Sequence, residues 1–106
     1  MSNNTKYGLH GKLTAKTGKG NELAQILLEA AELMKSASGC HLYVVGRSDQ
    51  HAEEVWVTEI WDTKEDHDQS LTAPEVRALI GRAMPLLGGP PQKGQELDIL
   101  GGLGIS

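Results

Sequence analysis

The order in which two hydrophobic periods follow one another most constrains the fold of this 106-residue chain. In residues 6–16, apolar side chains occupy every second position, which predicts a strand with one apolar face. The apolar members are Tyr7, Leu9, Leu13 and Ala15. Residues 20–37 instead repeat apolar side chains at spacings of three and four, which predicts an amphipathic helix. Gly39 is expected to stop this helix.

The rest of the chain predicts three more strands and two shorter helices. Residues 40–47 and 54–61 are rich in β-favouring side chains and flank a polar segment, which is typical of two strands joined by a hairpin loop. Asp62 or Thr63 is placed to cap a short acidic helix that runs to about residue 71. The capping-box spacing of Thr72 and Glu75, with a proline in the first turn, predicts a helix from there to about residue 84. Residues 95–100 are expected to form the last strand.

This order, β-α-β-β-α-β, predicts an α+β fold of the ferredoxin-like kind. Residues 6–106 would form a single domain behind a disordered polar tail of residues 1–5. Its antiparallel four-stranded sheet would carry helices on one face only. Four apolar strand residues compete for places on the opposite face. They are Leu42, Val44, Trp56 and Ile60. We therefore expect a homodimer that packs sheet face to sheet face.

Charge and composition exclude several classes of partner. The net charge of −4 argues against nucleic acid and against an anionic membrane surface. No apolar run is long enough to span a bilayer, and the first residues lack the apolar core of a secretory signal. A single cysteine, Cys40, excludes an intrachain disulfide framework. These features predict a cytoplasmic protein.

Residues 59–71 contain the strongest candidates for catalytic or binding residues. A predicted strand ends there in Trp61, and a short helix carries His67, whose imidazole titrates near neutral pH and is able to accept a proton from a phenol or enol. The alternative is a surface histidine whose charge is favoured by its acidic neighbours. Glu59 lies in an otherwise apolar strand. It either faces a pocket, with its pKa raised by burial, or pairs with Lys12 or Arg77.

Other candidates are less specific. Trp56 and Trp61 are expected either to line a pocket for an aromatic substrate or to belong to the core. Tyr7 and Tyr43 are able to donate a hydroxyl to a ligand. His10 and His41 face each other or a cavity, depending on the register of their strands. Neither they nor the acidic run around His67 have the ligand spacing of a metal site, and motifs for flavin, nicotinamide and nucleotide phosphates are absent.

Several local strings resemble the antibiotic biosynthesis monooxygenase family, in its small quinol monooxygenase-like branch, over residues 6–105. One is the turn with Lys16, Gly18 and Lys19 after the first strand. Another is the Glu59-x-Trp61 strand end. The remaining strings are residues 64–71, residues 74–80 and residues 84–86.

The resemblance implies a dimeric α+β barrel whose active members oxidise quinols or polycyclic phenols with O₂, without flavin, haem or metal. On that basis we expect His67 to act as base, and Arg77 to hold developing negative charge. Trp61, Trp56 and Met84 would form the apolar lining. The same residues leave two alternatives open. One is an isomerase or cyclase of small carbonyl compounds, in which His67 and Glu59 move protons, and the other is a dimer that binds a ligand without catalysis.

Overall fold

The computed structural model describes residues 5–105. Its elements alternate in the predicted order. They are β1 (Lys6–Thr14), α1 (Gly20–Met34), β2 (Cys40–Arg47), β3 (Glu54–Trp61), α2 (Lys64–Ser70), α3 (Pro74–Ala83), a 3₁₀ turn (Met84–Leu86) and β4 (Gln95–Ile99). The predicted tail of residues 1–5 lies outside the described residues except for Thr5. No helix within the described range has the length and apolar character needed to cross a membrane.

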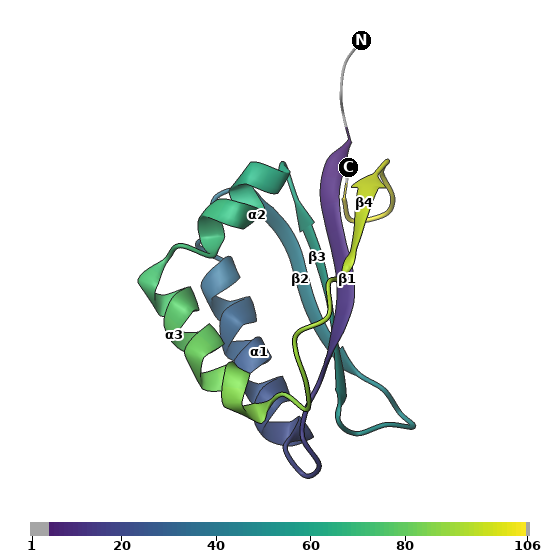
Figure 1. Cartoon of the computed structure of the whole chain (residues 1–106). Coiled ribbons are helices and arrows are strands. Elements are labelled where there is room, and N and C mark those ends of the chain that lie inside the picture. Colours follow the sequence, from purple (N-terminus) through teal and green to yellow (C-terminus); the bar gives the residue numbers. More distant parts are fainter. Residues whose placement is uncertain (1–4, 106) are drawn as a thin grey trace.

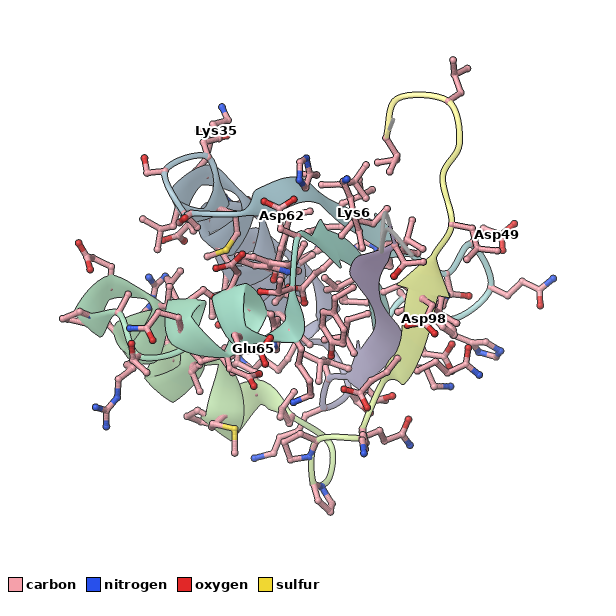
Figure 2. The ribbon with its side chains drawn as sticks, turned by 90° about the horizontal axis from the view of Figure 1, so that it is seen from above. Lys6, Lys35, Asp49, Asp62, Glu65 and Asp98 are labelled. Atoms are coloured by element: carbon pink, nitrogen blue, oxygen red, sulfur yellow. The ribbon has the colours of Figure 1, made fainter. Side chains whose placement is uncertain are left out.

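The four strands form one antiparallel sheet in the order β2-β3-β1-β4. All three α-helices cover the same face of this sheet (Figure 1). This arrangement confirms the predicted ferredoxin-like α+β fold. The view from above shows side chains filling the space between the helices and the sheet (Figure 2). It places Glu65 on the helical side, and Asp98 on the edge strand β4.

Three local predictions need correction. β1 ends at Thr14 rather than Lys16, because Ala15 already leaves the ladder to form an isolated bridge with Leu87. α1 ends at Met34 rather than at residue 37, and closes in hydrogen-bonded turns. The expected capping box before α3 does not form, because the hydroxyl of Thr72 donates to the carbonyl of Gln69, 2.7 Å away, and Ala73 takes the cap position.

The core lies between the sheet and the helices. Its fully buried side chains are Trp61, Leu23 and Val55. One cluster joins α1, β3 and α3 around Leu23 and Val55. A second cluster packs Met34 and Val76 with Trp61, below α2. Burying a side chain of this size contributes about 1.5–3 kcal/mol, so the two clusters fix the helices over the sheet.

The opposite face of the sheet carries the even-numbered residues of β1 and β3 and those of β2 from Leu42 onward, because side chains alternate along a strand. The register places Leu42 beside Ile60, and Val44 beside Thr58. Trp56 stacks on His10 on this face, with ring centroids 5.2 Å apart. The structure therefore confirms that Leu42, Val44, Trp56 and Ile60 lie away from the helices.

Candidate functional site

A cavity of about 220 Å³ lies between the helices and the sheet. Its wall is mostly aliphatic, and its polar members come from β2, β3 and α2. The polar members are Tyr43, Glu59, His67 and Ser70. Other hollows on the described part of the chain have volumes of about 400–430 Å³, and their walls contain no histidine. A mostly apolar cavity with a few converging polar groups is the usual form of a small-molecule site.

The position of His67 depends on how α2 begins. Thr63 caps this helix, since its side-chain oxygen accepts from the backbone N–H of Asp66 at 3.1 Å. The preceding turn brings Asp66 against Gly39, which has a positive φ of 83°. A Cβ at Gly39 would lie 2.7 Å from Cγ of Asp66, so only glycine allows this approach without a shift.

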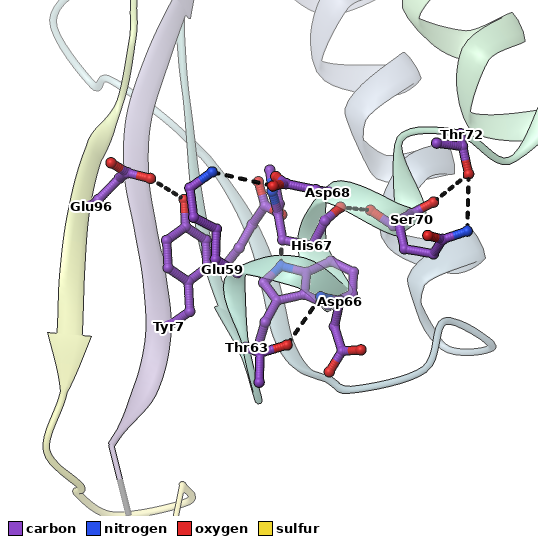
Figure 3. Close-up of polar contacts among 12 residues, drawn as sticks. Tyr7, Glu59, Thr63, Asp66, His67, Asp68, Ser70, Thr72 and Glu96 are labelled. Atoms are coloured by element: carbon purple, nitrogen blue, oxygen red, sulfur yellow. Dashed lines mark hydrogen bonds and ion pairs between the residues drawn. The ribbon is translucent and has the colours of Figure 1, made fainter. Parts of the chain in front are cut away.

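His67 faces inward from α2, and its side chain is 13% exposed. Its Nδ1 lies 3.0 Å from Oδ1 of Asp68, and its Nε2 lies 3.9 Å from Oε1 of Glu59 (Figure 3). The hydrogen bonds from His67 and Lys64 lower the pKa of Asp68, so this carboxylate is ionised at neutral pH and only accepts. Nδ1 of His67 therefore donates to Asp68, which leaves Nε2 free to take up a proton.

Glu59 projects from β3 into the same cavity and is also 13% exposed. Its Oε1 accepts a hydrogen bond of 3.0 Å from the indole N–H of Trp61. Burial raises the pKa of Glu59, and this effect outweighs the indole hydrogen bond and the nearby His67, which both lower it. The structure thus confirms the pocket-facing interpretation of Glu59. Pairing with Lys12 is wrong, because Lys12 pairs with Glu54 at 3.2 Å.

Two tyrosines flank the pair. Tyr43 lines the cavity from β2, and burial followed by the charge of Glu59 raises its pKa above the ordinary range of a phenol. Tyr7 packs against His67 with ring centroids 5.6 Å apart, and its hydroxyl donates to Glu96 of β4 at 2.9 Å. Burial and this hydrogen bond raise the pKa of Tyr7 to about 12. Both phenols therefore stay protonated at neutral pH.

The structure does not bring every predicted site residue to this cavity. Met84 and Tyr43 line it, and Trp61 packs edge-on against His67 at 5.7 Å without lining it. Trp56 and His10 lie on the opposite face of the sheet, where Nδ1 of His10 lies 2.9 Å from the hydroxyl of Thr58. Their even-numbered positions turn them away from Glu59, which has the odd parity of the helical face.

Arg77 and His41 also lie elsewhere. Arg77 is exposed on α3 and does not line the cavity, because the cavity side of that helix is formed by Val76, Leu79 and Ile80. His41 lies within a register irregularity of β2, between Cys40 and Leu42, and its Nε2 lies 2.6 Å from Oδ1 of Asp62 at the surface. His10 and His41 therefore do not face each other. No group of three or more potential metal ligands comes together within residues 5–105.

Sequence reasoning missed the contact of Asp68 with His67 and the cavity wall supplied by Leu71 and Ile80. A carboxylate next to a histidine in a helix usually points elsewhere, since adjacent residues do not share a helix face. Leu71 is a lone apolar residue after a polar helix, and Ile80 follows Leu79 in the apolar stripe of the next helix, so neither position signals a cavity wall. Nothing in the sequence alone places them at one opening.

This chain is similar in sequence and in fold to known proteins. A family model described as antibiotic biosynthesis monooxygenase matches residues 7–82. A solved structure from Chloroflexus aurantiacus, provisionally named an antibiotic biosynthesis monooxygenase, is 37% identical to this chain. The match covers 95% of this chain and 99% of the Chloroflexus chain, with a TM-score of 0.85. This chain belongs to the antibiotic biosynthesis monooxygenase family.

More distant structures of the family share the fold. One from Caulobacter crescentus is 20% identical, with a TM-score of 0.81 and 92% coverage of both chains. Another, from Nitrosomonas europaea, is 12% identical, with a TM-score of 0.83 and 94% coverage of both chains. No curated protein matches this chain. The family assignment therefore establishes the architecture, while the reaction has to be argued from the cavity.

Proposed function

We propose that this protein is a monooxygenase that oxidises a phenolic or quinol-like substrate with O₂ and uses no cofactor. The observation that carries the proposal is the pairing of His67 with Glu59 at one end of an apolar cavity. Membership of the antibiotic biosynthesis monooxygenase family supports it. Such a site has the three things that this chemistry needs, namely a base, a place for an aromatic ring and low access of water.

In the proposed reaction the substrate supplies all the electrons. Nε2 of His67 takes the phenolic proton, and the resulting electron-rich anion reduces O₂. For a hydroquinone, one oxygen atom of O₂ enters the ring and the other leaves as water, so that the product is a hydroxyquinone. The four electrons that O₂ accepts come from the ring, which explains why no other reductant is required.

Glu59 has a second role in this scheme. Because burial raises its pKa, the carboxyl group is able to hold a proton next to Nε2 of His67. A protonated Glu59 returns a proton to the reduced oxygen while His67 keeps the one it has removed. Proton transfers of this kind contribute about 10²–10⁴-fold to a rate. Tyr43, which lines the same end of the cavity, is placed to hold the substrate hydroxyl by a hydrogen bond.

We further propose that the protein is a homodimer joined through the open faces of its sheets. Leu42, Val44 and Leu97 lie on this face, and Val44 and Leu97 are exposed. The middle of the face carries no charged side chain among the described residues, and Lys12 at its end is neutralised by Glu54. Two copies with a net charge of −4 each therefore meet here without repulsion between like charges.

A second function is favoured by the same pair of groups. An isomerase or cyclase of a small carbonyl compound needs one group that removes a proton and another that returns it. Glu59 and His67 meet this need without O₂. The requirement for oxygen distinguishes the two functions.

The test of the proposed function is oxygen uptake by the chelator-treated protein with a panel of hydroquinones, against a control without protein. We expect enzyme-dependent uptake, which falls about 100-fold or more in His67→Ala. The matched control is His51→Ala, since His51 is exposed in the β2–β3 loop, away from the cavity.

Four outcomes would contradict the proposal. Product formation that continues unchanged under nitrogen would favour the isomerase. Equal loss in both histidine variants, or full activity in folded His67→Ala, would remove His67 from the mechanism. Binding of the panel without any turnover would leave a ligand-binding dimer as the function.

A further inference from the structure

The opening of the cavity is lined by apolar side chains that solvent reaches. Leu71, Ile80 and Met84 are among the large hydrophobic residues that remain exposed, and all three also line the cavity. Pro91 completes this rim. Exposed hydrophobic residues scattered singly need no explanation, but a group at the mouth of a cavity marks a surface that a ligand covers.

The cavity behind the rim is small. Its volume of about 220 Å³ exceeds the roughly 150 Å³ that is known to hold benzene, but falls short of the 300 Å³ or more of typical drug-sized sites. A single ring with its hydroxyl group fills this space. A polycyclic substrate does not fit inside it without displacing the wall.

The charge of the site restricts the ligand further. Among the described residues that line the cavity there is no Lys or Arg, and His67 is the only group able to become cationic. Glu59 lies within the cavity and Asp68 lies just behind His67. A carboxylate or phosphate on the ligand would therefore lose its hydration without gaining an opposite charge.

We infer that the substrate is an uncharged single-ring phenol or hydroquinone that carries an alkyl chain. The ring occupies the cavity with its hydroxyl at His67 and Glu59, and the chain leaves through the mouth over Leu71, Ile80 and Met84. This inference names the substrate class and rests on the proposed function for its chemistry. It concerns binding alone, however, and is tested without turnover.

The test is calorimetric binding of 4-alkylphenols under nitrogen, from 4-ethylphenol to 4-hexylphenol. Burial of each added methylene is expected to tighten binding about two- to fourfold until the chain passes the rim. Met84→Ser and Ile80→Ser should reduce this gain with chain length, so that they weaken the binding of 4-hexylphenol much more than the binding of 4-ethylphenol. The matched control is Leu28→Ser, because Leu28 on α1 is equally exposed but does not line the cavity.

4-Hydroxybenzoate serves as the anionic probe. We expect it to bind at least about tenfold more weakly than 4-ethylphenol, since no cation receives its carboxylate. Equal or tighter binding of this acid would overturn the inference, and so would an affinity that does not change with chain length. A change in oligomeric state in Ile80→Ser would assign the rim to another copy of the chain instead. If O₂ uptake fails but the chain-length series holds, only the proposed oxidation is wrong.

Discussion

Nε2 of His67 and Oε1 of Glu59 lie 3.9 Å apart, beyond a direct hydrogen bond and close enough to share a substrate hydroxyl. The spacing follows from two separate elements, because Glu59 belongs to the sheet and His67 to the short helix α2 (Figure 3). Each group has one partner outside the cavity, Trp61 for the carboxyl group and Asp68 for the imidazole. Nε2 of His67 and the second carboxyl oxygen of Glu59 are not used by these two partners, and both side chains line the cavity in which a ligand would bind.

Removing the charge of Glu59 should change how stability depends on pH. Burial raises its pKa above the ordinary 4.5, so the folded protein holds this proton more tightly than the unfolded chain. The stability that the proton provides is complete below the ordinary pKa and is lost as the pH rises through the raised one. We therefore expect Glu59→Gln to be more stable than wild type at neutral pH, and to lose this advantage towards about pH 4.

Thermal unfolding of both proteins between about pH 4 and pH 8 tests this prediction. The difference between the two curves is the informative quantity. Asp62 and Asp68 have lowered pKa values and make the opposite contribution in both proteins, so that their effect cancels in the difference. A difference that stays constant with pH would show that Glu59 is ionised in the folded state as readily as in the unfolded chain.

Asp68 should act on the reaction only through His67. Asp68→Asn replaces a carboxylate, which only accepts hydrogen bonds, by an amide, which also donates them. The amide no longer selects the neutral form of His67 that carries its proton on Nδ1 and leaves Nε2 free. We expect turnover to fall about tenfold, less than for removal of His67 itself, and the pH profile of turnover to shift. Glu65→Gln removes an exposed carboxylate from the same helix and should leave both quantities unchanged. Steady-state rates across pH compare the three proteins.

Much of this architecture is predictable from the sequence, because strands and helices have different hydrophobic periods. The four strands and the capped helix α2 were predictable because alternation and the Thr63 cap are local signals. The face of a strand residue is fixed by register, which depends on pairing across the whole sheet. That is why the sequence alone does not show that Trp56 and His10 lie on the face opposite to His67. The inward direction of His67 likewise depends on how α2 packs on the rest of the fold, where Asp66 of that helix lies against Gly39.

Gly39→Ala should test that docking directly. Its positive φ disfavours any side chain, and a Cβ there would also force the side chain of Asp66 on α2 to shift. We expect a loss of about 1–3 kcal/mol in the free energy of unfolding, together with a loss of turnover in the protein that remains folded.

Two glycine variants separate the causes. Gly18→Ala has a similar φ of 82° with open space around it, so it should cost about 1–2 kcal/mol and leave turnover unchanged. Gly46→Ala has neither problem and should change stability by no more than about 0.5 kcal/mol. Chemical denaturation and turnover measured on all three variants make the comparison. Normal turnover in Gly39→Ala would mean that His67 does not depend on this contact.

The dimer is tested by a charge on the open face of the sheet. Val44 and Leu97 are 52% and 46% exposed there, and in the proposed dimer both become buried. An aspartate at either position would lose its hydration at the interface without a partner, which should weaken the dimer about 100-fold or more. Leu28→Asp on α1 is the control, because Leu28 is 47% exposed on the helical side.

Sedimentation equilibrium should show monomers for the two face variants and dimers for wild type and the control. A dimer that survives both face variants but not Leu28→Asp would place the interface on the helices.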